Sequence, residues 1–373
     1  MTVPSALTPF EPQIGSATTD DFRRRLELTR FPDPELVDDW SQGHPIAAAH
    51  QLRDALLAHD FGECLETMSE LGSYRISLDG LETHLLYMPG PADSVPLILT
   101  HGWPGGIVEF LDVAGRLSEH HTLIIPSLPG FGFSEKPCAV GMTLEAIADR
   151  WAALMAALGH ERYVAQGGDW GSEVSALLAQ RHPDPCLGAH VNMVSARPTV
   201  DVMADPTDAE VSQMKRQKDW GRYEMAYFRQ QASRPQTLGY GLADSPMGQA
   251  AWIAEKVHAW TDSSADEPYG GVLLNRMLDL ICLYWFTNSA TSSSRLYWES
   301  GYGSGRTEIT APVACALYPA EINAPSRRWA EGRYTNIVRW NEHDRGGHFP
   351  AMEVPELFIE DVRHGVDAIL RAR

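Results

Sequence analysis

The alternation of apolar and polar side chains is clearest in residues 74–87. Residues 74–78, Tyr-Arg-Ile-Ser-Leu, alternate strictly, and residues 81–87 follow as a second extended segment after Asp79-Gly80. A period of two is typical of a strand with one buried face. An Asp-Gly pair between two such segments favours a two-residue turn. The pattern therefore predicts a β-hairpin.

Before this hairpin, apolar residues recur at the spacing of a helix. Residues 20–28 predict a short helix with an acidic first turn. Residues 46–70 predict two more helices, in which Leu52, Leu56 and Leu57 recur at helical spacing. Residues 1–70 therefore form a largely helical N-terminal segment.

After the hairpin, short apolar runs alternate with helical segments. Residues 95–100 and 122–126 are continuous apolar runs, with a helical segment at 107–117 between them. A helix over 144–158 leads into the apolar run 163–166, and another helix follows. Strands that are apolar on both faces and alternate with helices are typical of a parallel sheet covered on both sides. We therefore predict an α/β fold with a mostly parallel, doubly wound sheet.

Residues 196–305 interrupt this alternation. They are helical in pattern and rich in aromatic residues, without a clear buried strand, and the alternation resumes at residues 312–317. The sequence therefore predicts an α/β core made of residues 71–195 and 306–373, with residues 196–305 inserted as a helical cap over the sheet.

The charge of the chain limits its partners. Lysine and arginine number 30 against 49 aspartates and glutamates, a formal net charge of −19. This acidic surplus argues against nucleic acid or an anionic membrane as a partner. Residues 1–10 lack the basic and apolar pattern of a signal peptide. No apolar run approaches the roughly 20 residues that span a bilayer, so we expect a cytoplasmic protein without a membrane anchor.

The cysteines do not have the spacing of a disulfide framework or a metal site. Their number is odd, so free, mostly buried thiols in a reducing compartment are expected. They are Cys64, Cys138, Cys186, Cys282 and Cys315.

Residues 167–172, Gly-Gly-Asp-Trp-Gly-Ser, lie between a predicted strand and a predicted helix. They have the form of a nucleophile elbow, with Asp169 where esterases carry serine. Gly167 and Gly171 would permit the close approach of strand and helix that such a turn requires. The same residues would also suit a glycine-rich turn with an aspartate cap on the following helix.

A second motif favours the elbow over the simple turn. His101-Gly102-Trp103-Pro104-Gly105 directly follows the apolar run 95–100. In α/β-hydrolases this strand end supplies one backbone N–H of an oxyanion hole, and the residue after the nucleophile supplies the other. These amides would be those of Trp103 and Trp170. We expect His101 to fix the loop rather than to catalyse.

A catalytic histidine should follow late in the chain, because the fold has the order nucleophile, acid, histidine. His348 lies in a glycine-rich loop before the final helix at 354–370, and His343 is its rival. The acid that orients it should follow an earlier core strand, and Glu321 does so 27 residues ahead of His348. The alternative acids are Glu299, Glu342 and Asp344.

Taken together, these motifs resemble the microsomal-type epoxide hydrolases, a group that includes juvenile hormone epoxide hydrolases. The resemblance covers almost the whole chain. It includes Pro9-Phe10, Arg24-Arg25-Leu26 and Thr29-Arg30-Phe31, which look like the family's N-terminal segment that wraps the core. It implies an α/β-hydrolase fold and a covalent mechanism on Asp169. The N-terminal membrane anchor of the mammalian members is not found, so the chain resembles a soluble, bacterial relative.

The resemblance also implies two cap tyrosines that assist ring opening. Tyr227 and Tyr297 match these positions, and Tyr223 and Tyr302 lie near enough to be alternatives. By composition alone these would be ordinary aromatic residues of the cap core. The family's loop further implies a cis peptide bond between Trp103 and Pro104.

Aspartate suits this chemistry because it is ionised at neutral pH without an activating base. Its attack on an epoxide carbon gives a hydroxyalkyl ester, which water activated by His348 can cleave, whereas a serine would give an inert ether. A tyrosine hydroxyl can protonate the epoxide oxygen while remaining protonated itself beforehand. The reaction, which yields a vicinal diol, needs only water and no metal or organic cofactor.

Two other functions remain open from the sequence. A haloalkane dehalogenase would use the same Asp169 and His348, but would bind halide through Trp or Asn N–H groups. A non-catalytic small-molecule receptor on the same fold would not need nucleophile, acid and base together. The 11 tryptophans favour an apolar substrate, while the sequence leaves open whether the protein forms a homodimer.

Overall fold

The computed structural model describes residues 3–264, 268–270, 272, 274–301 and 305–373. Within this part of the chain, one nine-stranded sheet forms the centre, in the order β1-β2-β3-β5-β4-β6-β7-β8-β9. The first three strands run antiparallel to their neighbours, and the pairs from β5 to β9 are parallel. The strands are β1 (Thr8–Pro9), β2 (Ser73–Leu78), β3 (Leu81–Met88), β4 (Leu97–Thr100), β5 (Leu123–Pro126), β6 (Tyr163–Gly167), β7 (Cys186–Val191), β8 (Val313–Leu317) and β9 (Ile337–Glu342).

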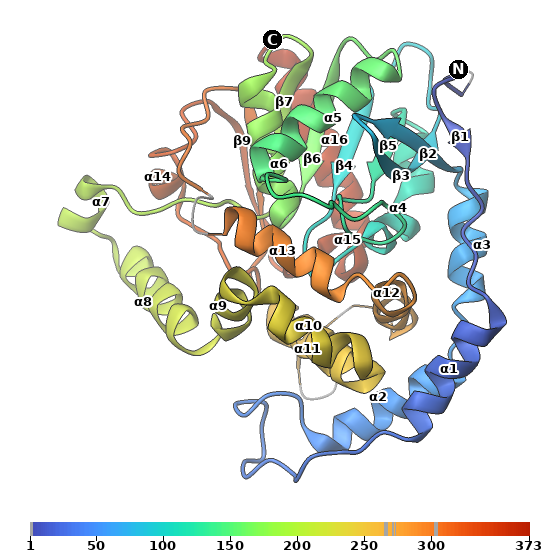
Figure 1. Ribbon diagram of the computed structural model, residues 1–373. Coiled ribbons are helices and arrows are strands. Elements are labelled where there is room, and N and C mark those ends of the chain that lie inside the picture. Colours follow the sequence, from blue (N-terminus) through green and yellow to red (C-terminus); the bar gives the residue numbers. More distant parts are fainter. Residues whose placement is uncertain (1–2, 265–267, 271, 273, 302–304) are drawn as a thin grey trace.

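Helices cover the two faces of this sheet (Figure 1). Strands β4 to β8 are buried along their whole length, as expected for strands with helices on both sides. One face carries α5 and α6, and the other carries α4 and α16. The core helices are η1 (Ile107–Phe110), α4 (Leu111–Ser118), α5 (Leu144–Ala157), α6 (Trp170–Arg181), α14 (Arg327–Ala330), α15 (Pro350–Glu353) and α16 (Pro355–Arg371).

Between β7 and β8 the described chain is helical, and Figure 1 shows these helices gathered beneath one end of the sheet. Parallel strands all present their carboxyl ends at the same edge, which is where ligands bind in α/β sheets. The helices are α7 (Val200–Ala204), α8 (Asp208–Tyr223), α9 (Ala226–Ser233), α10 (Pro235–Asp244), α11 (Pro246–Trp260), α12 (Leu274–Phe286) and α13 (Ala290–Ser300).

The N-terminal helices run along one side of the core and reach the inserted helices (Figure 1). They are α1 (Ser16–Glu27), α2 (Ile46–Ala58) and α3 (Gly62–Glu70). Arg25 donates from Nη1 to the carbonyl oxygen of Asp244 at 2.8 Å, and His59 Nε2 lies 2.8 Å from Asp279 Oδ1 in α12. The segment therefore fastens the inserted helices to the core.

The structure confirms the predicted hairpin, the α/β sheet and the inserted helical cap. The first helix begins earlier than expected, at Ser16, so its acidic residues lie in the second turn rather than the first. The predicted helix at 107–117 is a 3₁₀ turn followed by α4. All five cysteines are free, and Cys138 is exposed while the other four are buried. None of the helices described here is both long and apolar enough to cross a membrane.

Candidate active site

Asp169 occupies a sharp turn between the end of β6 and the start of α6. Its backbone has φ 50° and ψ −129°, a conformation that non-glycine residues rarely adopt. A Cβ at Gly171 would lie 1.8 Å from the Thr100 carbonyl oxygen, and one at Gly167 would lie 2.1 Å from the Gly171 oxygen. Only glycine permits this approach of strand and helix. The turn thus has the strained geometry of a nucleophile elbow.

The loop after β4 faces this carboxylate. The Trp103 backbone N–H donates to Asp169 Oδ1 at 2.8 Å, and the Trp103–Pro104 peptide bond is cis, as predicted. Gly102 lies so close that an added Cβ would stand 2.2 Å from Asp169 Oδ1. Trp170, the residue after the nucleophile, begins α6. The first expected oxyanion-hole donor is therefore aimed at Asp169.

His101 holds this loop from inside the core. It is buried, and its two ring nitrogens lie 3.0 Å from the Gly102 oxygen and 3.1 Å from the Leu128 backbone nitrogen. Burial lowers the pKa of His101 to about 4, so the ring is neutral at physiological pH. Both nitrogens are occupied by backbone groups, in agreement with a structural role.

His348 lies between Asp169 and Glu321. Its Nε2 is 3.4 Å from Asp169 Oδ2, and its Nδ1 is 2.8 Å from Glu321 Oε1. All three side chains are buried or nearly so. Burial alone would lower the pKa of His348, but the negative charges of Glu321 and Asp169 raise it well above its ordinary value. The structure thus brings together the predicted nucleophile, acid and base.

The alternative acids and base lie in other surroundings. His343 stacks on Tyr318 and approaches Asn341 and Asp361 instead. Glu342 is exposed and accepts a hydrogen bond from its neighbour Trp340. Glu299 accepts a hydrogen bond from the Gly141 backbone N–H, and Asp344 is exposed. The geometry thus favours His348 and Glu321 over these alternatives.

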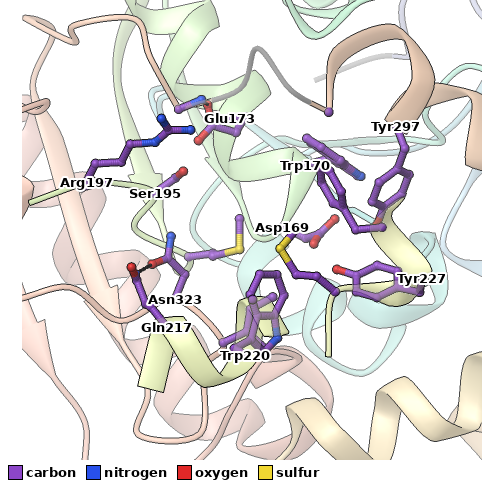
Figure 2. Close-up of a pocket in the computed structure, with 18 residues that line it drawn as sticks. Asp169, Trp170, Glu173, Ser195, Arg197, Gln217, Trp220, Tyr227, Tyr297 and Asn323 are labelled. Carbon is purple, nitrogen blue, oxygen red and sulfur yellow. Dashed lines mark hydrogen bonds between the residues drawn. The ribbon is translucent and has the colours of Figure 1, made fainter. Parts of the chain in front are cut away.

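Tyr227 from α9 and Tyr297 from α13 reach Asp169 from the cap. In Figure 2 both hydroxyl ends point toward the Asp169 carboxylate. The Tyr227 ring stacks on Trp103 at 5.2 Å, and the Tyr297 ring meets Trp170 edge-on at 4.8 Å. Burial raises the pKa of each phenol well above 10, and the negative charge of Asp169 acts in the same direction. Both hydroxyls therefore keep their protons at neutral pH.

The two alternative tyrosines are Tyr223 and Tyr302, and the structure describes only Tyr223. Tyr223, at the end of α8, is 65% exposed, and it is absent from the lining of the cavity at Asp169. Tyr302 lies outside the described residues. Of the described tyrosines, Tyr227 and Tyr297 are the ones that line this cavity.

A cavity of about 320 Å³ opens beside Asp169 (Figure 2). This volume lies near the lower end of the roughly 300–1,000 Å³ usual for small-molecule sites. Its wall is apolar around the carboxylate, where Trp170, Tyr227, Phe228 and Tyr297 contribute. Its other wall carries polar side chains, namely Glu173, Ser195, Arg197, Gln217 and Asn323. Among the described residues, no group of His, Cys, Asp or Glu is arranged to hold a metal ion.

Sequence reasoning missed several charged residues around this site. Glu109 accepts from the Gly106 N–H at 3.1 Å, and burial raises its pKa to about 8 against the opposing charge of His348. Lys256 lies 5.0 Å from the Tyr227 ring centre. A charged residue within the apolar stretch 107–110 was the available signal for Glu109. Lys256 follows Glu255 in a segment with no motif around it, so the sequence did not indicate that its side chain lies near Tyr227.

The base is also attached to the cap. The His348 backbone N–H donates to the Trp260 carbonyl oxygen at 2.8 Å, at the end of α11. Glu353 accepts from the Asp262 N–H at 3.0 Å and from the Phe349 N–H at 2.9 Å. Burial raises the pKa of Glu353 to about 7. The histidine loop is therefore bonded on both sides of His348 to the cap or to its own helix.

Family models match two parts of the chain. The model described as "Epoxide hydrolase N terminus" matches residues 7–110, and the model described as "alpha/beta hydrolase fold" matches residues 95–237. Together they cover the N-terminal segment, the elbow and the first helices of the cap.

Named relatives match over most of their length. A protein of Stigmatella aurantiaca, provisionally named an epoxide hydrolase, is 40% identical over 96% of this chain and 84% of its own. Epoxide hydrolase 1 of Sus scrofa is 28% identical over 96% of this chain and 88% of its own.

Solved structures are similar over nearly the whole chain. The juvenile hormone epoxide hydrolase of Bombyx mori superposes with a TM-score of 0.91 at 26% identity, covering 99% of this chain and 96% of that one. The epoxide hydrolase of Aspergillus niger gives a TM-score of 0.88 at 27% identity, covering 99% of both chains.

Proposed function

This chain belongs to the microsomal-type epoxide hydrolase family, and we propose that it converts an epoxide to a vicinal diol through an ester on Asp169. One observation carries the proposal. Two protonated tyrosines face the elbow carboxylate from the cap, while Nε2 of His348, a ring oriented by Glu321, lies 3.4 Å from Asp169 Oδ2. This arrangement provides a nucleophile, a proton source and a base at one point.

In the first half of the reaction, an Asp169 oxygen forms a bond to an epoxide carbon, and the ring C–O bond breaks. The departing oxygen would become an alkoxide, a poor leaving group, unless it receives a proton. Tyr227 or Tyr297 donates that proton, and the second phenol supports the developing charge by a hydrogen bond. The product is a hydroxyalkyl ester of Asp169 and a transient phenolate.

In the second half, water attacks the ester carbonyl and His348 accepts one of its protons. The tetrahedral intermediate then breaks the bond between the carbonyl carbon and the alkyl oxygen, and His348 returns its proton to the departing diol oxygen. The regenerated Asp169 carboxyl gives its proton to the phenolate, which restores the starting state of the site. The Trp103 and Trp170 amides stabilise the oxyanion of the tetrahedral intermediate. The ester carries no charge, so one of the two carboxylates that raise the pKa of His348 has been neutralised by the first half-reaction. Alkylation therefore lowers that pKa and converts His348 into a better base at the step that requires one.

A single turnover in ¹⁸O-water tests this route. With enzyme in excess, the oxygen added to the first product comes from the Asp169 carboxylate, so the diol should be mostly unlabelled. The label should appear in the peptide that contains Asp169, and later turnovers should release it into diol. Mass spectrometry of diol and peptide gives both readings. Labelled diol in the first turnover with an unlabelled peptide would mean direct attack by water.

Glu321→Gln should separate the two halves of the reaction. Glu321 raises the pKa of His348, so the variant should have a lower His348 pKa and more neutral imidazole at acidic pH. Loss of the oriented ring and of the compensating charge should still slow ester hydrolysis by roughly 10²–10⁴-fold. Rapid quenching should show alkyl-enzyme accumulating after a normal burst of ring opening.

The control for this variant is Glu342→Gln, at an exposed acid that has no contact with His348. It should keep wild-type rates in both halves. If Glu321→Gln slowed ring opening and hydrolysis equally, Glu321 would be a structural residue of the loop instead of the partner of the base.

We extend the proposal to the organisation of the chain. Residues 1–70 form the wrapping segment, residues 71–195 and 306–373 the core, and residues 196–305 the cap. The end of β7 at Val191 and the start of β8 at Val313 support the limits of the insertion. We propose a cytoplasmic location because the five cysteines are free thiols, as in a reducing compartment. Whether the protein forms a homodimer can be measured by light scattering.

A further inference from the structure

The cavity beside Asp169 is divided by the chemistry of its walls. Figure 2 shows Asp169, Tyr227 and Tyr297 on one side, and Arg197, Ser195 and Glu173 on the other. Epoxide opening and ester hydrolysis involve the side with Asp169 and the two tyrosines. The polar side with Arg197 takes no part in either step. An apolar epoxide would fill the space near the tyrosines and leave the polar wall without a ligand.

The charges on the polar wall do not cancel. Glu173 is buried and forms a two-bond ion pair with Arg333, at 2.7 Å and 2.8 Å, so its charge is already compensated. Arg197, on the segment after β7, is exposed at the cavity, and within the described part of the chain it forms no hydrogen bond or ion pair. The pair of Glu173 and Arg333 is neutral as a unit, so the uncompensated charge at this wall is the positive charge of Arg197.

Two other polar side chains that line the cavity with Arg197 can donate hydrogen bonds. The Asn323 side-chain oxygen accepts from Gln217 Nε2 at 2.9 Å, which leaves the Asn323 amide nitrogen as a donor. The Ser195 hydroxyl can donate as well, and it lines the same cavity. A ligand that suits a guanidinium, a hydroxyl and an amide N–H is one that accepts hydrogen bonds and carries negative charge. A carboxylate meets both conditions.

We propose that the substrate is an epoxide that carries a carboxylate at its far end, bound by Arg197 across the cavity from Asp169. This proposal rests on the proposed function of the site. An apolar stretch must separate the two groups, because Trp220, Met225 and Phe228 also line the cavity. Arg197 is then a residue that selects the substrate and takes no part in bond breaking.

The test uses straight-chain terminal epoxides of several lengths, each ending in a carboxylate, a methyl ester or a methyl group. Wild-type enzyme should prefer the carboxylate over its methyl ester about tenfold in kcat/KM at one optimal length, the effect of a charge-assisted hydrogen bond that remains partly open to water. The preference should lie in KM, because Arg197 binds the ground state and the transition state equally.

Arg197→Met should raise KM for the carboxylate about tenfold and leave the methyl ester and alkane epoxides unchanged. Arg197→Lys should recover part of the preference, because it keeps the charge but loses the two-pronged geometry of the guanidinium. The matched control is Arg222→Met, which removes an exposed arginine near the end of α8 that does not line the cavity. This variant should leave KM unchanged for both the carboxylate and the methyl ester epoxides.

The outcomes distinguish this inference from the function on which it rests. Equal kcat/KM for carboxylate and ester in wild-type enzyme, or an equal loss of both in Arg197→Met, would overturn the inference while diol is still produced. If none of the epoxides, charged or neutral, gave diol, the proposed function itself would fail.

Discussion

His348→Gln should open one epoxide per active site and then stop. The variant keeps Asp169, both tyrosines and the Trp103 amide, so the ester can form. It lacks the base that activates water, and general bases contribute roughly 10²–10⁴-fold to such steps. Steady-state diol formation should fall by at least this factor. Intact-protein mass spectrometry should find an adduct of one substrate mass, located by digestion on the peptide that contains Asp169.

His343→Gln is the matched control for this experiment. His343 lies five residues earlier in the same region, but it stacks on Tyr318 and contacts Asn341 and Asp361. It should retain turnover and show no adduct. A His348→Gln protein that neither forms an adduct nor makes diol, while its thermal unfolding matches the wild type, would contradict the covalent mechanism.

Replacing both Tyr227 and Tyr297 with Phe should nearly abolish turnover, and the loss should fall on ring opening. Without a proton donor the epoxide oxygen must leave as an unprotonated alkoxide, and loss of a general acid costs roughly 10²–10⁴-fold. Each single variant should be slower than wild type but active, because the remaining phenol can still donate. Single-turnover measurements of ester formation should show the defect, with ester hydrolysis little changed.

Tyr223→Phe controls for the removal of a phenol from the cap. Tyr223 is 65% exposed and does not line the cavity, so its variant should behave as the wild type. If the double variant kept wild-type rates, the tyrosine assignment would be wrong. Tyr302, the other tyrosine suggested by the sequence, would then be the next position to replace.

Local patterns predicted the parts of the fold that are determined locally. Asp79-Gly80 marked the hairpin turn, and Gly167 and Gly171 around Asp169 marked the elbow, because positive φ and close backbone approach require particular residues. Strand β7 was not predicted. Its central residues, Gly188 to His190, do not look like a buried strand, and His190 is tolerated there because its Nε2 is 3.0 Å from Asp361 Oδ2 in α16.

In the candidate site, too, the residues in local motifs could be predicted from the sequence, and those that depend on distant partners could not. Asp169 and His348 stand in motifs that are visible within a few residues, and chain order pointed to Glu321. The polar wall of the cavity could not be predicted, because it depends on which charges find partners at a distance. Glu173 is paired with Arg333, 160 residues further along the chain, and Arg197 has no such partner among the described residues. Only the folded arrangement distinguishes a compensated charge from an available one.

The hydrogen bond from His348 to the end of α11 restricts how substrate and product can move through this enzyme. If α11 lifted away as a lid, it would break the bond to the Trp260 oxygen and displace the base with it. The bond between Asp262 and Glu353 would break in the same movement, and the N-terminal helices hold α10 and α12 from outside. Entry and exit along the open cavity beside α8 leave these contacts intact. Substrate and product therefore pass along the cavity wall that carries Arg197.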